Sequence, residues 1–107
     1  MRDVDLAAFA AAHSDGAVVV DVREPAEYLA GHVPGAKLVP MDQLPNRLQD
    51  LPRHKPIYLV CASGTRSSAM AGLLVREGYD AYSVDGGTSA WARSGRPTVR
   101  GPQEQLA

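Results

Sequence analysis

The sequence contains one cysteine, Cys61, and its surroundings make it the residue best placed to do chemistry. Residues 57–60, which precede it, are apolar or aromatic, and the small residues 62–65 separate it from Arg66. A cysteine acts as a nucleophile through its thiolate, and a nearby arginine or helix N-terminus lowers the pKa of the thiol. The spacing therefore predicts a reactive thiolate at Cys61.

The segment after Cys61 has the features of a loop that binds an anion. Its side chains are small, so backbone N–H groups can turn toward one point, and Gly64 permits the positive φ that tight curling needs. A helix that begins at Ser67 adds N–H donors and the positive end of its dipole. Arg66 adds a permanent positive charge. The predicted binding residues of this loop are Ala62, Ser63, Gly64, Thr65 and Arg66.

A buried structural role is the alternative for Cys61, because free cysteines are among the most buried residues in proteins. The strand, loop and helix expected around the thiol, together with Arg66, favour a reactive one. A single cysteine also excludes an intramolecular disulfide, CxxC redox chemistry and a multi-cysteine zinc site.

The elements that must hold this loop follow from the apolar pattern. Apolar runs predict strands at residues 17–22, 37–39, 57–60 and 81–84. Helices are predicted at residues 6–15, 25–29, 43–51 and 67–77, and a last short helix is capped by Thr88. This alternation indicates an α/β fold whose central, mostly parallel sheet has roughly four or five strands and carries helices on both faces. Reacting groups in such folds lie beyond the carboxyl ends of the strands, where Cys61 and Arg23 fall.

Length and composition bound the remaining possibilities. The 107 residues suffice for one domain, residues 1–100, followed by a polar tail, residues 101–107, that we expect to be a loose end. Eleven basic and 12 acidic residues, net charge −1, argue against a nucleic-acid surface. No apolar stretch approaches about 18 residues, so no membrane span is expected. Asp3 and Asp5 interrupt any signal-peptide pattern, and a cytoplasmic location is the resulting expectation.

Several polar residues have two interpretations. Arg23 either reaches the pocket of the cysteine or forms an ion pair with Glu27 at helical spacing. Asp21 lies in an apolar run, so it needs a buried hydrogen-bond partner and is interpreted as structural. His32 is a candidate general acid or base, but a structural hydrogen bond, for example to Asp21, is favoured. His13 lies in a polar context and is predicted to be solvated.

Two pairs of residues are assigned structural tasks. Gly86 and Gly87 are expected to let the chain pass close to the Cys61 loop, since they lack side chains. Tyr28 and Trp91 are expected to pack in the core.

Three blocks of residues, in order along the chain, resemble one known family. The blocks are Asp21-Val22-Arg23-Glu24 with Glu27-Tyr28 and Gly31-His32-Val33-Pro34-Gly35-Ala36, then residues 61–67, then Asp85-Gly86-Gly87 with Trp91, Gly95 and Pro97. Together they are similar to the rhodanese family, the thiosulfate sulfurtransferases, over about residues 4–99. The resemblance implies a single-domain, rhodanese-like three-layer fold.

The resemblance also implies a mechanism. A donor such as thiosulfate transfers its sulfane sulfur to Cys61 and leaves as sulfite, so that Cys61 holds a persulfide. A thiol or cyanide then accepts that sulfur. The implied partners are a small sulfur-containing anion or thiol, with a protein as a further candidate donor or acceptor. No metal and no organic cofactor is implied.

The length and the charge of the loop distinguish a sulfurtransferase from related activities and bear on its donor. Four residues lie between Cys61 and Arg66, whereas the related phosphatases and arsenate reductases use a longer loop that encloses a tetrahedral anion. Some thiosulfate-preferring relatives carry basic residues directly after the cysteine, where this chain has Ala62 and Ser63. The donor is therefore left open among thiosulfate, a protein persulfide and glutathione persulfide. A sulfur-relay protein and a non-catalytic binding module are the alternative functions.

Overall fold

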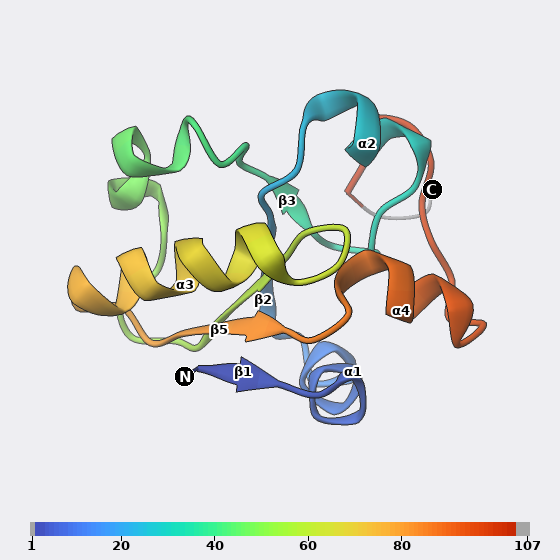
Figure 1. Cartoon of the computed structure of the whole chain (residues 1–107), viewed down its shortest axis with the longest axis horizontal. Helices are drawn as coiled ribbons and strands as arrows, with labels where there is room; N and C mark the ends of the chain where they lie inside the picture. Colours follow the sequence, from blue (N-terminus) through green and yellow to red (C-terminus); the bar gives the residue numbers. More distant parts are fainter. Residues whose placement is uncertain (1, 105–107) are drawn as a thin grey trace.

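A computed structural model describes residues 2–104, and its centre is a five-stranded sheet in the order β1-β5-β4-β2-β3 (Figure 1). The strands are β1 (Asp3–Val4), β2 (Val18–Asp21), β3 (Lys37–Leu38), β4 (Ile57–Val60) and β5 (Ala81–Val84). Every pair of neighbouring strands is parallel. The predicted parallel sheet is confirmed, and the three longest strands coincide with the apolar runs of the sequence.

Helices cover both faces of this sheet. They are α1 (Leu6–Ser14), α2 (Pro25–Ala30), α3 (Thr65–Arg76) and α4 (Gly87–Arg93), and two 3-10 turns, η1 (Leu44–Asn46) and η2 (Leu48–Asp50), precede β4. Figure 1 shows α3 on one side of the sheet and α1 on the other. The predicted three-layer arrangement is confirmed.

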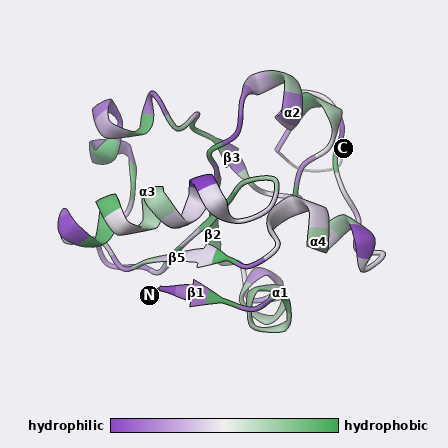
Figure 2. Cartoon of the chain, viewed as in Figure 1, coloured by the Kyte–Doolittle hydropathy of each residue, from purple (hydrophilic) through white to green (hydrophobic). Residues whose placement is uncertain are grey.

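Two apolar clusters, one on each face, hold the layers together. Leu59 of β4 packs with Leu74 of α3 in the first cluster. The next residue of β4, Val60, lies in the second cluster with Phe9 of α1 and Trp91 of α4. Successive side chains of a strand point to opposite faces, so a strand covered on both sides must be apolar throughout. Figure 2 shows green and purple segments alternating along α3, as expected for a helix with one buried face.

The segment before β4 departs from the predicted helix at residues 43–51. It forms the two 3-10 turns instead. Pro45 is accommodated in the first of these turns, at a position where a helix makes no use of the missing N–H. Leu44 and Leu51 are nevertheless buried, as the apolar pattern predicts.

Three further boundaries differ from the prediction. β1 was not predicted, because its two residues, one of them Asp3, carry no apolar pattern and are held by pairing with Ser83 and Val84 of β5. Helix α3 begins at Thr65 rather than Ser67, since Gly64 takes the capping position with φ of 109°. Helix α4 is preceded by Gly86 at its cap rather than by Thr88.

The tail is attached to the domain as far as it is described. Gly101 N–H donates to Leu29 O at 2.9 Å, and Gly35 N–H donates to Glu104 O at 2.7 Å. A ring nitrogen of His32 also lies 2.7 Å from Gln103 O. The expectation of a loose end is therefore wrong for residues 101–104, while residues 105–107 lie outside the described part. Within that part, no helix has the length and apolar character needed to cross a bilayer.

Candidate functional site

Cys61 lies where β4 ends, and the segment 61–66, here called the Cys61 loop, connects it to α3. The Cys61 side chain is 1% exposed. Gly64 N–H donates to Sγ at 3.1 Å, and the Ser67 hydroxyl lies 3.5 Å from Sγ. The buried strand thus fixes the sulfur at the floor of a short loop, directly under the N-terminus of α3.

These contacts decide the ionisation of the thiol. Burial raises the pKa of Cys61, but hydrogen bonds from the Ser67 hydroxyl and from the backbone N–H groups of Ser67, Gly64 and Ser63 lower the pKa more, so that the pKa lies below its usual value. A hydrogen bond to the charged form of an acid favours that form. The direction agrees with the sequence-based expectation of a thiolate, and the donors are neutral groups of the loop.

Ser67 belongs to a buried pair of hydroxyl groups that sequence reasoning missed. Its Oγ lies 2.8 Å from Ser83 Oγ and 3.3 Å from Gly64 O. Both serines are buried, with relative exposures of 0% and 1%. A polar residue inside the apolar run 81–84 was the available signal, because such a residue needs a buried partner. The pair holds the hydroxyl that faces the sulfur.

The start of α4 packs closely against the Cys61 loop, as predicted for Gly86 and Gly87. Thr88 N–H donates to Cys61 O at 2.8 Å, and Ser89 N–H donates to Ala62 O at 3.0 Å. A Cβ atom on Gly87 would lie 2.3 Å from Cys61 O, so only glycine allows this approach. In Figure 1 the loop between β4 and α3 lies beside the start of α4.

Arg66 forms an ion pair with Glu27 of α2. Its Nη1 and Nη2 atoms donate to the two carboxylate oxygens at 2.7 and 2.9 Å. The hydrogen bond from Arg66 is the main cause that lowers the pKa of Glu27 to about 2, and Glu27 in turn raises the pKa of Arg66. The predicted pairing of Glu27 with Arg23 is therefore wrong. Sequence reasoning missed Glu27 as a neighbour of the site, because its partner stands 39 residues away in the chain.

Arg23 pairs with Asp21, which is the buried partner that Asp21 was predicted to need. Arg23 Nε lies 2.9 Å from Asp21 Oδ1, and Nη2 lies 2.8 Å from Oδ2. Nη2 also donates to Gly31 O at 2.9 Å. Both side chains are buried. These contacts give Arg23 a structural role at the start of α2.

Arg23 also lines a cavity between α2 and α4. The cavity has a volume of about 270 Å³ and is lined by Arg23, Glu27, Ala30, Gly31, Thr88, Ser89, Ala92 and Thr98. None of these residues belongs to the Cys61 loop, and the cavity is related to the loop only through Thr88 and Ser89, whose N–H groups bind the carbonyls of the loop.

The histidines lie elsewhere. His32 is fully buried and stacks on Tyr28, with Nδ1 at 2.9 Å from Tyr28 O. The hydrogen bond suggested between His32 and Asp21 is therefore wrong, while the structural role holds. His13 is half-buried and its Nε2 lies 2.7 Å from Pro34 O, so it is not a solvated side chain. Tyr28 and Trp91 are buried in the core, as predicted.

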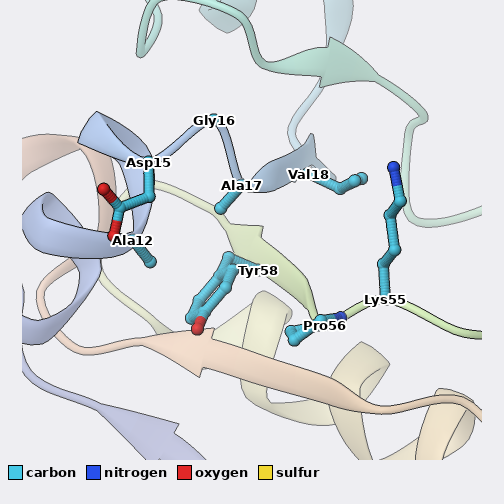
Figure 3. Close-up of a pocket in the computed structure, with 8 residues that line it drawn as sticks. All are labelled: Ala12, Asp15, Gly16, Ala17, Val18, Lys55, Pro56 and Tyr58. Carbon is cyan, nitrogen blue, oxygen red and sulfur yellow. The ribbon is translucent and has the colours of Figure 1, made fainter.

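A second cavity, of about 250 Å³, lies near the start of β2 and β4, at the opposite end of these strands from Cys61 (Figure 3). Its lining includes Val18 at the start of β2, Pro56 before β4, and Tyr58. Cys61 follows the other end of β4, so this cavity is not part of the cysteine site. Among residues 2–104, no cluster of three or more His, Cys, Asp or Glu side chains is arranged to hold a metal ion.

Comparisons with known proteins show the family of this chain. Residues 5–94 match the family model of the rhodanese-like domain. A sulfurtransferase from Allochromatium vinosum is 36% identical over 82% of this chain and 83% of its own length. The thiosulfate sulfurtransferase GlpE from Pseudoalteromonas translucida is 37% identical over 69% of this chain and 71% of its own. A crystal structure of a rhodanese-related protein from Thermoplasma volcanium superposes with a TM-score of 0.87 at 30% identity, over 92% of this chain and 98% of that one. The chain belongs to the rhodanese-like domain family.

Proposed function

We propose that this protein is a sulfurtransferase that carries a sulfane sulfur atom on Cys61 as a persulfide. The observation that carries the proposal is the set of neutral hydrogen-bond donors around Sγ, which stabilises an anionic sulfur at one fixed point. Relatives that are named sulfurtransferases and share 36–37% identity with this chain support the same activity.

The reaction runs in two half-reactions through a covalent intermediate. The Cys61 thiolate attacks the sulfane sulfur of the donor, a new S–S bond forms, and the old bond breaks with its electron pair leaving on the donor. With thiosulfate as donor, the leaving group is sulfite. An acceptor thiolate or cyanide then attacks the outer sulfur of the persulfide, and Cys61 leaves as a thiolate.

Burial of the thiol explains why sulfur is the transferred group. Cys61 is 1% exposed, so only a slender terminal atom can reach Sγ without displacing the loop. A terminal sulfur atom is such a group, whereas a phosphorus atom is shielded by its oxygens. This argues against the phosphatase alternative, as does the short distance in sequence between Cys61 and Arg66.

Mass spectrometry of the intact protein tests the proposal directly. After incubation with thiosulfate we expect a gain of one sulfur atom, about 32 Da, because the mechanism requires a covalent intermediate. Cyanide should remove the added mass with formation of thiocyanate. Cys61→Ala is the control and should gain nothing. If no sulfane donor, organic persulfides included, adds mass to the wild-type protein, the proposed function is wrong.

A further inference from the structure

Two arginines lie next to the Cys61 loop, and a carboxylate neutralises each of them. Arg66 binds Glu27 through two hydrogen bonds, and Arg23 binds Asp21 through a buried ion pair. The loop residues 62–65 carry no charge. Each ion pair is therefore neutral as a unit, and neither arginine offers an unpaired positive charge beside the thiolate.

The Arg66–Glu27 pair interacts with the charge of the Cys61 thiolate. The thiolate of Cys61 contributes to the raised pKa of Arg66, so Arg66 and the sulfur interact electrostatically. Glu27 also lines the cavity between α2 and α4. Its carboxylate places a negative charge at that cavity and binds both terminal nitrogens of Arg66, the cation at the end of the Cys61 loop that would attract an anion.

The pair does little for the fold. Its two side chains are 35% and 36% exposed, and an ion pair at that exposure contributes little to stability because water and salt screen it. Glu27 does have one local task, since its Oε1 accepts a hydrogen bond from Glu24 N–H at 3.0 Å in the capping box of α2. A glutamine keeps an oxygen for that bond and loses only the charge.

We propose that Glu27 is a specificity-determining residue of this site: by holding Arg66, it makes the Cys61 loop discriminate against dianionic sulfur donors and favours donors with one negative charge. The inference rests on the proposed sulfur transfer to Cys61. The favoured donors are then compounds that carry a sulfane sulfur and little negative charge, such as an organic persulfide. Thiosulfate, a dianion, is a disfavoured donor.

Two donors of nearly the same shape separate charge from size. Thiosulfate is a dianion, and methanethiosulfonate replaces one of its oxygens by a methyl group and is a monoanion. Both give the same Cys61 persulfide, and the S–S bond of the donor breaks to release sulfite or methanesulfinate. The rate of Cys61 loading, followed by intact mass, is the measurement for each donor.

Glu27→Gln should accelerate loading from both donors to different extents. Coulomb energy is proportional to the product of the charges, so a freed Arg66 is expected to raise the thiosulfate rate about tenfold and the methanethiosulfonate rate about threefold. The gain for the dianion is thus about the square of the gain for the monoanion. Equal gains, or no gain, would overturn the inference.

Matched variants show that the effect passes through Arg66. Asp50 binds Arg47 in an exposed pair on η2, which lies by the far end of α3 in Figure 1, and Asp50→Asn should change neither rate. In an Arg66→Gln background, Glu27→Gln should raise both rates much less, because no guanidinium is left to be freed. A full tenfold thiosulfate gain in that background would show that Glu27 does not act by holding Arg66.

Salt dependence tests the same idea without any variant. With the thiolate counted, the wild-type site carries one net negative charge, so added sodium chloride should screen its repulsion of thiosulfate and raise the loading rate, whereas the rate of Glu27→Gln should rise less. A steep fall for the wild-type protein would overturn the inference even if Glu27→Gln fails to fold. Absence of loading from either donor is a different result, because it would contradict sulfur transfer itself.

Discussion

At the scale of single residues, neutral donors rather than cations set the state of the Cys61 thiol. Burial opposes ionisation, and the Ser67 hydroxyl and the N–H groups of the loop outweigh it. Arg66, which the sequence suggests as the activating charge, is engaged by Glu27. The thiolate therefore depends on the geometry of the loop more than on a neighbouring charge.

Ser67→Ala should raise the pKa of Cys61, because it removes the hydroxyl that faces Sγ at 3.5 Å. At a pH near the pKa a smaller fraction of the protein then carries the thiolate, so sulfur loading slows there and recovers as the pH rises. The rate of alkylation by iodoacetamide as a function of pH measures the shift of the midpoint. Ser68→Ala, one residue further along α3, is the matched control. An unchanged midpoint in Ser67→Ala would contradict this role.

The ion pair of Glu27 predicts a flat pH dependence for donor discrimination. Arg66 lowers the pKa of Glu27 to about 2. Glu27 therefore stays a charged carboxylate at every pH above the usual pKa range of a glutamate. The stability that the pair contributes is present above the pKa of an unfolded glutamate and is lost as the pH falls toward 2. The ratio of the thiosulfate rates of Glu27→Gln and wild type should therefore stay constant between about pH 5.5 and 8.5. A ratio that collapses near pH 6 would show that Glu27 titrates there.

The residues of the Cys61 loop could be predicted in full from the sequence, but the charged residue that pairs with Arg66 could not. Cys61 and residues 62–66 follow one another, so their meeting is a local property. The partner of Arg66 comes from another element, 39 residues away, and helical spacing wrongly suggested Arg23 for Glu27. Ser83 was hidden for the same reason, since only the packing of α3 against β5 brings it to Ser67. Long-range partners depend on packing, which a pattern of residue types does not contain.

At the scale of elements, the cysteine site is a junction of β4, α3 and the turn before α4. The strand delivers the thiol, the helix N-terminus supplies donors, and Thr88 and Ser89 fix the carbonyls of the loop. The apolar runs predict the strands well, because a strand that is buried on both faces must be apolar along its whole length. They fail for residues 43–51, where two 3-10 turns replace the predicted helix.

Gly87→Ala should disrupt the junction. Its Cβ would lie 2.3 Å from Cys61 O and 2.8 Å from Ala62 O, both backbone atoms that cannot turn aside. We expect a loss of about 2–4 kcal/mol in the free energy of unfolding, as for other overpacked or strained sites, and slower sulfur loading. Thermal or urea unfolding and intact mass measure the two effects.

Gly72→Ala is the matched control for that change. Gly72 lies inside α3 and nothing lies within 4 Å of a Cβ atom placed there. Alanine is the better helix former, so a gain of about 0.5–1 kcal/mol in stability is expected, with sulfur loading unchanged. A destabilised Gly72→Ala together with a stable Gly87→Ala would contradict the packing described here.

At the scale of the whole molecule, residues 101–104 close the domain over α2 and the turn that follows it. They bind Leu29, His32 and Gly35, and the last two lie in the turn that leads toward β3. The buried ring of His32 thus spans two segments, with one nitrogen near Tyr28 O and the other near Gln103 O. A segment that reads as polar tail in the sequence is part of the packed structure.

A chain that ends at Arg100 should be less stable than a chain that ends at Glu104. The shorter chain loses the hydrogen bonds of Gly101 and Glu104 and the contact of Gln103 with His32, and about 1–3 kcal/mol is expected for groups left without partners. Urea unfolding measures the difference, and faster amide exchange at Gly35 should accompany it. Equal midpoints for the two chains would show that the tail contributes nothing.

The contact between Gly87 and the Cys61 loop has a consequence for the protein while it is being made. A ribosome delivers Cys61 well before β5, Gly87 and α4, so the thiol emerges before the backbone that supports its loop exists. In a nascent or prematurely terminated chain that stops short of residue 87, Cys61 is an ordinary cysteine with an ordinary acidity. Only a chain that extends into α4 can form the contacts of Gly87 and Thr88 that hold the loop, and with them the lowered pKa of the thiol.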